Sequence, residues 1–97
     1  MAYCIVHRFP GATKEQYEAA IAEVHPEGGS GLPEGQIIHI AGATDDGWIV
    51  IGLHDSRESW ERFRDQTLMA GLQRLGDAGP PTPPDETTFE THRVQQA

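Results

Sequence analysis

Apolar residues gather in four short runs that are separated by turn-forming residues, and each run predicts a β-strand. The first run is rich in β-branched and aromatic residues and stops at Pro10-Gly11, a strong turn signal. The second and third are separated by residues 42–47, whose composition suits a hairpin turn. A stiff proline-rich connection, residues 77–85, precedes the fourth. The predicted strands are residues 2–9, 36–41, 48–54 and 87–94.

Two other segments carry apolar residues at helical spacing. The first helix is predicted over about 14–25: Thr13 can cap it, Gln16 completes a capping box, and Pro26 ends it. The glycine-rich stretch 27–35 that follows is predicted to be a loop.

The second helix is the longer and more apolar one. Asp55 or Ser56 can serve as its N-cap, and Gly76 stops it. Its apolar face consists of Trp60, Phe63, Thr67, Leu68, Leu72 and Leu75.

The order of these elements is β-α-β-β-α-β. Right-handed crossovers fold this order into a four-stranded antiparallel sheet with both helices on one face and strand order 4-1-3-2. The predicted fold class is therefore α+β, ferredoxin-like, in a single domain that spans residues 1–97.

The alternation of side chains divides the predicted sheet into two faces, and neither is polar. One face carries Cys4, Val6, Ile38, Ile40, Ile49, Ile51 and Leu53. The other carries Tyr3, Ile5, His7, Phe9, Ile37, His39, Trp48, Val50 and His54. Because two helices can cover only one face, an identical sheet is the simplest cover for the second, which predicts a homodimer.

Charge and composition exclude several classes of partner. The chain has 15 acidic and 7 basic residues and a formal charge of −8, so it offers no basic surface to nucleic acid or anionic lipid. No apolar run is long enough to span a membrane and the first residues do not form a signal peptide, so we expect a cytoplasmic protein. The lone cysteine, Cys4, is expected to be a buried hydrophobe without chemistry.

Three of the five histidines share the aromatic face of the sheet: His7, His39 and His54. Imidazoles in an aromatic-lined space suit proton transfer to an organic substrate, although each could instead be a satisfied core or interface residue. If His39 pairs with Val50 in the hairpin, His7 lies two strand spacings away, about 9–10 Å, which suits an organic ring better than a metal. His54 is expected toward the opposite end of its strand and least able to share this site.

The sequence also offers structural explanations for one further histidine and for two aromatic residues of the second helix. His25, at the end of the first helix, is predicted to be a favourable charge there. The side chains of Trp60 and Phe63 belong to the core or to a pocket wall.

Two passages of the chain resemble the dimeric α+β barrel superfamily, and within it the antibiotic biosynthesis monooxygenase-like proteins. They are residues 9–17, FPGATKEQY, after the first strand, and residues 53–63, LHDSRESWERF, which lead into the second helix. The resemblance extends from Tyr3 to Val94 and is more specific for fold than for reaction, because the superfamily includes cofactor-independent oxygenases, haem-degrading enzymes, cyclases and isomerases.

The resemblance implies roles for individual residues. His7 lies where similar oxygenases carry a polar pocket residue, commonly Asn, and Phe63 where they carry a Trp. Gln73 replaces the histidine that binds iron in the haem-degrading members, which disfavours that activity. Similar cyclases pair a His with a Tyr, a role open to His7 or His39 with Tyr17.

The sequence thus predicts a small homodimeric enzyme that acts on an aromatic or polyketide-like metabolite by His-assisted proton abstraction, as a cofactor-independent monooxygenase. A polyketide cyclase or isomerase, and a non-catalytic dimer that binds a hydrophobic small molecule, are the alternatives. The predicted catalytic residues are His7, His39 and Tyr17. The predicted substrate-binding residues are Trp48, Phe63, His54 and Trp60, with no metal and no cofactor.

Overall fold

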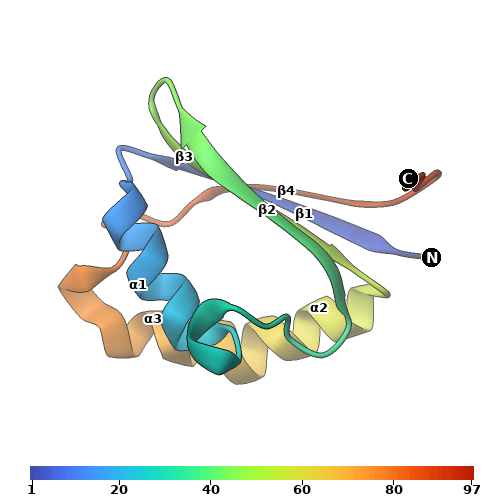
Figure 1. Cartoon of the computed structure of the whole chain (residues 1–97), viewed down its shortest axis with the longest axis horizontal. Helices are drawn as coiled ribbons and strands as arrows, with labels where there is room; N and C mark the ends of the chain where they lie inside the picture. The colour runs from blue at the N-terminus through green and yellow to red at the C-terminus, as the bar shows by residue number, and fades with distance from the viewer.

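The computed structural model describes residues 1–97 as a four-stranded antiparallel sheet with helices beneath one face (Figure 1). The strands lie in the order β2-β3-β1-β4, which confirms the predicted βαββαβ topology and the ferredoxin-like α+β class. The elements are β1 (Tyr3–Pro10), α1 (Lys14–Val24), β2 (Gln36–Thr44), β3 (Gly47–His54), α2 (Arg57–Phe63), α3 (Met69–Leu75) and β4 (Asp85–Glu90).

The predicted capping residues begin both helices. In α1 the Gln16 N–H donates to Thr13 Oγ1 and the Thr13 N–H donates to Gln16 Oε1, which is a complete capping box. Ser56 caps α2 by accepting a hydrogen bond from the Ser59 N–H. A π-helical turn, Arg64–Leu68, joins α2 to α3, and the run ends at Gly76, whose φ of 54° suits glycine.

Within the layer of helices, α1 contacts α3 directly. Gly71 of α3 is buried there, and a Cβ at this position would overlap Cγ1 of Val24 in α1. An ion pair between Arg74 and Glu23 crosses the same contact. A residue without a side chain is therefore required for this close approach.

The β2–β3 hairpin is longer than predicted. Thr44 pairs with Gly47, so the turn contains only Asp45 and Asp46, and the small residues at 42–44 belong to β2. The tighter turn moves the register by two residues: His39 lies opposite Gly52, not opposite Val50 as predicted. Since a shift of two residues preserves alternation, His39 remains on the predicted face.

A β-bulge near the start of β2 changes the alternation. Gln36 pairs with His54 and Ile38 pairs with Leu53, so Ile37 is an extra residue in β2. The bulge leaves Ile37 44% exposed and places Gln36 on the same face as His39. The predicted place of Ile37 among the pocket-facing residues is therefore wrong.

The fourth strand spans residues 85–90 and not the predicted 87–94. It pairs with β1 from Asp85, opposite Arg8, to Glu90, opposite Tyr3. Beyond it the Thr91 N–H donates to the Ala2 carbonyl.

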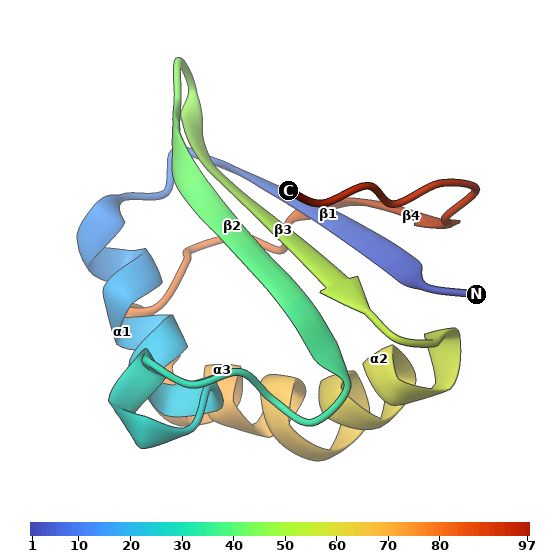
Figure 2. The ribbon, with the colours of Figure 1, turned by 45° about the vertical axis from the view of Figure 1, so that its right-hand side comes forward.

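The histidine-bearing face of the sheet is the one that meets the helices. Tyr3 and Ile5 form the core with Trp60 of α2, and Phe63 and Leu68 pack against them. Figure 2 shows α1 and the α2–α3 run beneath this one face.

The opposite sheet face carries no helix (Figure 1). Most of the residues on it are apolar. Ile40 is 55% exposed there, while Val6, Ile49 and Ile51 are partly exposed. None of the helices combines the length and the apolar character needed to cross a bilayer.

Candidate active site

A cavity of about 510 Å³ lies between the sheet and the helices, and the proline-rich segment 79–84 forms part of its wall. This volume is typical of a small-molecule site. All seven residues predicted to be catalytic or substrate-binding line it: His7, Tyr17, His39, Trp48, His54, Trp60 and Phe63.

Tyr17 of α1 and His39 of β2 form a direct pair in this cavity. The Tyr17 hydroxyl lies 2.7 Å from Nε2 of His39. Burial lowers the pKa of the His39 imidazole to about 4, and nearby His25 contributes to the lowering. Burial also raises the pKa of the Tyr17 phenol, so both groups are neutral at physiological pH.

Gln36 connects this pair to His54. Its Oε1 lies 3.1 Å from Nδ1 of His39, and its Nε2 lies 3.1 Å from Nε2 of His54. The amide lies beside Gly52, where a Cβ would be in ordinary van der Waals contact with Gln36 Nε2 at 3.7 Å. His54 was expected to be remote from His39, yet the bulge in β2 places a hydrogen-bonding side chain between them.

The imidazole of His54 is fully buried and lines the cavity. Its Nδ1 lies 3.3 Å from Ser59 Oγ, and its ring packs against Trp60 at 5.6 Å and Phe63 at 5.9 Å between centroids. Burial lowers the pKa of His54. Trp60 and Phe63 thus serve both predicted roles, as core residues and as pocket wall.

His7 occupies a separate part of the cavity wall, on β1. Its Nε2 lies 2.8 Å from Oε2 of Glu86 on β4, and the register places the two residues directly opposite one another. The His7 ring packs edge-on against Trp60, with centroids 5.8 Å apart. The His7 side chain is 13% exposed and that of Glu86 is 48% exposed, so the pair lies at the border between cavity and solvent.

His25 is part of the same cavity wall. Its Nδ1–H donates to the Gly31 carbonyl at 3.0 Å, and its ring lies 4.7 Å from that of His39. Burial lowers the pKa of His25, which is only 7% exposed. The prediction that His25 carries a charge at the helix end is therefore wrong, because a buried imidazole is neutral at physiological pH.

Trp48 contributes the remaining aromatic wall. Its ring lies 5.2 Å from that of Tyr17. Its Nε1–H is buried without a hydrogen-bond partner. An acceptor atom on a bound molecule would satisfy this donor.

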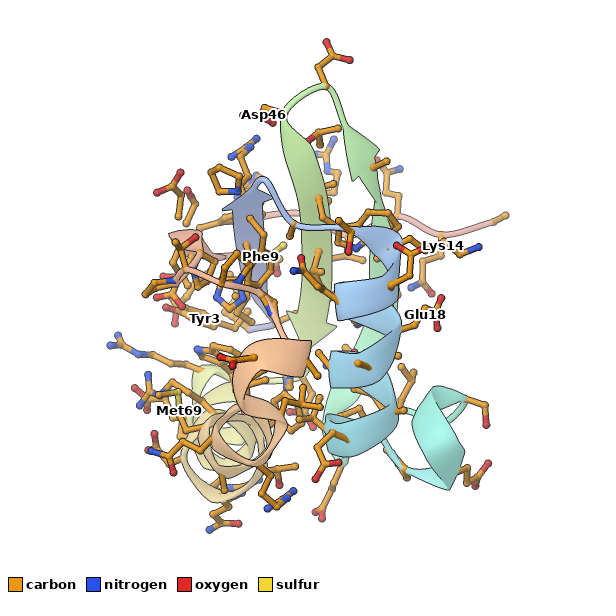
Figure 3. All side chains as sticks on the ribbon, turned by 90° about the vertical axis from the view of Figure 1, so that its left-hand side faces the viewer. Tyr3, Phe9, Lys14, Glu18, Asp46 and Met69 are labelled. Carbon is orange, nitrogen blue, oxygen red and sulfur yellow. The ribbon has the colours of Figure 1, made fainter.

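The polar lining of the cavity carries little positive charge. His25, His39 and His54 are neutral for the reasons given above, and Arg64 is engaged by the neighbouring Asp65 at 2.8 Å. Figure 3 shows other charged side chains, including Lys14 and Glu18 of α1 and Asp46 of the hairpin turn, directed away from the cavity into solvent. No three side chains of His, Cys, Asp or Glu converge as a metal-ligand set. Cys4 is buried on the opposite face of the sheet, and burial raises the pKa of its thiol.

Four polar residues of the site were missed in the sequence: Gln36, His25, Ser59 and Glu86. Simple alternation places Gln36 on the face opposite His39, and only the bulge corrects this. Glu86 was assigned to no element, because the proline-rich connection was predicted to end at residue 85 and the fourth strand to begin at residue 87. Its place opposite His7 follows from the register of β1 and β4.

Comparison with known proteins identifies the fold. No protein-family model matches the sequence, and no curated protein matches it. The structure is similar to a crystal structure provisionally named as an antibiotic biosynthesis monooxygenase from Chloroflexus aurantiacus, with a TM-score of 0.67 and 17% sequence identity over 99% of this chain and 98% of that one. The chain therefore shares the ferredoxin-like α+β fold of that structure.

Proposed function

We propose that this protein is a homodimeric enzyme that takes a planar aromatic, polyketide-like metabolite into the cavity and removes a proton from it, with a monooxygenase-like outcome. The observation that carries the proposal is the presence of two polar pairs, His7–Glu86 and Tyr17–His39, in the wall of one aromatic-lined cavity. An imidazole held by a carboxylate, beside a second imidazole held by a phenol, provides the groups that proton abstraction in an apolar pocket requires.

His7 is the proposed general base. If its Nε2–H donates to the Glu86 carboxylate, then Nδ1 is the ring nitrogen that can accept a proton. The carboxylate orients the ring and stabilises the imidazolium that forms, as the acidic member of a catalytic triad does.

Tyr17 and His39 have a different proposed role. With a pKa of about 4, His39 is a weak base at neutral pH. We assign the Tyr17–His39 pair to binding an oxygen atom of the substrate. The neutral lining of this wall favours an uncharged ligand over a carboxylate or phosphate, and the unpaired Trp48 Nε1–H provides a further donor.

The proposed reaction needs dioxygen and a substrate with an acidic methylene. Loss of a proton to His7 gives a delocalised carbanion, which transfers electrons to dioxygen. The balance is CH₂ + O₂ → C=O + H₂O, so the substrate itself is oxidised and dioxygen is reduced. Because the carbanion supplies the electrons, the proposal includes no flavin, haem or metal.

The alternative is cyclisation or isomerisation. It is favoured by the short contact between Tyr17 and His39, because a phenol oxygen whose proton is donated to His39 can accept a hydrogen bond from an enol hydroxyl before an intramolecular condensation. Product analysis distinguishes the two outcomes, since cyclisation consumes no dioxygen.

The proposed dimer uses the uncovered face of the sheet. Its apolar residues, including the 55% exposed Ile40, form the kind of continuous surface that a second copy of the same sheet would cover.

Anthrone is a suitable probe, because it is planar and uncharged and its methylene is acidified by the conjugated ketone and rings. Binding is followed by quenching of Trp48 and Trp60 fluorescence, and turnover by oxygen uptake and product mass. We expect His7→Ala to lower kcat by about 10²–10⁴-fold with binding retained. His92→Ala, in the exposed C-terminal segment, is the matched control. Binding without turnover by any route would support a non-catalytic binding protein, and absence of binding would contradict the proposed ligand class.

A further inference from the structure

Five side chains from four separate elements contact one another in series along the cavity wall. Tyr17 Oη lies 2.7 Å from His39 Nε2, and His39 Nδ1 lies 3.1 Å from Gln36 Oε1. Gln36 Nε2 lies 3.1 Å from His54 Nε2, and His54 Nδ1 lies 3.3 Å from Ser59 Oγ. Ser59 Oγ lies 3.1 Å from the Ser56 carbonyl, where the series ends.

The final contact indicates the direction of the hydrogen bonds. A carbonyl can only accept, so the Ser59 hydroxyl donates to Ser56 and its oxygen accepts the Nδ1–H of His54. A neutral His54 then has no proton on Nε2, so this atom accepts from the Gln36 amide N–H.

The bonds at Gln36 fix the direction of the remaining hydrogen bonds as well. The Gln36 Oε1 accepts the Nδ1–H of His39, which leaves His39 Nε2 unprotonated. This nitrogen accepts the Tyr17 O–H. The chain thus makes five hydrogen bonds, all in one direction.

If every donor and acceptor in the chain were exchanged, the chain would make one hydrogen bond fewer. It would make only four, because Ser59 would donate to His54 and lose its bond to the Ser56 carbonyl. The Tyr17 hydroxyl would then have no acceptor within the protein, since His39 is its only side-chain partner. Unpaired polar groups in a buried wall are costly, so the forward direction is favoured.

We infer that Gln36 is a positioning residue that holds His39 as the Nδ1–H tautomer, through a hydrogen-bond chain anchored at the Ser56 carbonyl. The tautomer follows from the contacts alone, whereas its consequence for turnover rests on the proposed function.

The direction of the chain defines what Tyr17 offers to a ligand. Its proton is committed to His39, so its oxygen faces the cavity as an acceptor. A ligand hydroxyl, such as a phenol or an enol, can donate to that oxygen without disturbing the chain. A ligand carbonyl can bind there only if all five side chains reverse. This wall is therefore selective for the hydroxyl form of a ligand.

The test is ¹⁵N NMR of the histidine rings in the full-length protein at pH 7, where protonated and unprotonated ring nitrogens are well separated in chemical shift. We expect His39 and His54 to be single Nδ1–H tautomers. An Nε2–H tautomer of His39 in the wild-type protein would overturn the inference.

Two substitutions at position 36 test the role of Gln36 as the positioning residue for His39. In Gln36→Glu the carboxylate still accepts from His39 but can no longer donate to His54. We therefore expect His39 to keep its tautomer while His54 changes to Nε2–H. In Gln36→Leu neither bond remains, and His39 should become a mixture of tautomers. Gln73→Leu, exposed on α3, is the matched control and should change neither ring.

Unchanged tautomers in folded Gln36→Glu would overturn the role of Gln36, even if Gln36→Leu does not fold. These spectra require no substrate, so they stand apart from the oxygen-uptake assay. A confirmed tautomer together with an inactive wild-type protein would preserve the inference and contradict the proposed function.

Discussion

Nε2 of His7 lies 2.8 Å from a carboxylate oxygen of Glu86, although the two residues are 79 positions apart. They meet because β1 and β4 are neighbours in the sheet and these two positions are paired in the register. The pairing of the first and last strands thus brings an imidazole and a carboxylate together at the cavity border.

Replacement of Glu86 by Gln should slow the proposed reaction with little effect on folding. The amide can still accept a hydrogen bond from His7, but it lacks the charge that stabilises an imidazolium. We expect kcat to fall about tenfold or more with KM nearly unchanged. Glu90→Gln, exposed on the same strand, is the control, and equal effects from the two variants would contradict the role assigned to Glu86.

Stability should fall as the pH is lowered through the acid range. Between pH 6.5 and about 4 the unfolded chain takes up a proton at His39 while the folded chain does not, because burial lowers the folded-state pKa to about 4. The contribution of His39 to the free energy of unfolding is therefore fully present above pH 6.5 and is progressively lost as the pH falls toward 4. The shift at His39 contributes about 1–3 kcal/mol, after allowance for its partial exposure.

Urea unfolding at pH 7 and pH 4.5 measures this loss. His39→Gln, which does not titrate there, should lose less stability between the two pH values than the wild-type protein. A His92→Gln control should behave like the wild type, since His92 is exposed.

The contact between Gly71 and Val24 predicts a specific packing defect. Gly71→Ala should destabilise the fold by about 1–2 kcal/mol, because the added methyl overlaps Val24 and the gain in helix propensity offsets only part of the strain. Thermal or urea unfolding measures the change. Adding Val24→Ala should make the Gly71→Ala substitution less costly, which a double-mutant cycle detects. Gly42→Ala, with open space around its Cβ position, should be close to neutral.

The proposed dimer can be tested at Ile40, an exposed apolar residue of the uncovered sheet face on the edge strand β2. Ile40→Glu places a charge in the predicted interface and should weaken association on the order of 100-fold, because an unpaired buried charge is strongly unfavourable. Native mass spectrometry and light scattering report the subunit number. Leu32→Glu, at a similarly exposed position in the loop before β2, should leave a dimer intact. A monomeric wild-type protein would contradict the dimer.

The fold was largely predictable because its signals are local and redundant. Strand order follows from the number and sequence of elements, and both helix starts carry explicit capping residues such as Thr13 and Ser56. The prediction that His39 shares a face with His7 and His54 was correct despite an incorrect register, because the register error was an even number of residues. Which face meets the helices was not predictable, since both are apolar.

The site was only partly predictable. The residue types that carry it, such as His7, His39 and Tyr17, are conspicuous in the sequence, and the cavity brings all of them to its wall. The connecting residue Gln36 was not predictable from alternation, because a bulge is a backbone irregularity without a clear signal in this sequence. The neutrality of His25 depends on burial by distant segments.

Ile37 can be gained or lost in evolution without turning Gln36 away from the histidines. Deletion of this one residue would restore regular alternation and leave Gln36 opposite His54, on the face of His39, while the rest of β2 from Ile38 onward could keep its pairing with β3. A single codon lost at this point would thus shorten the strand and keep a hydrogen-bonding side chain between the two histidines. Relatives that are one residue shorter here should keep this connection where their glutamine and histidines align.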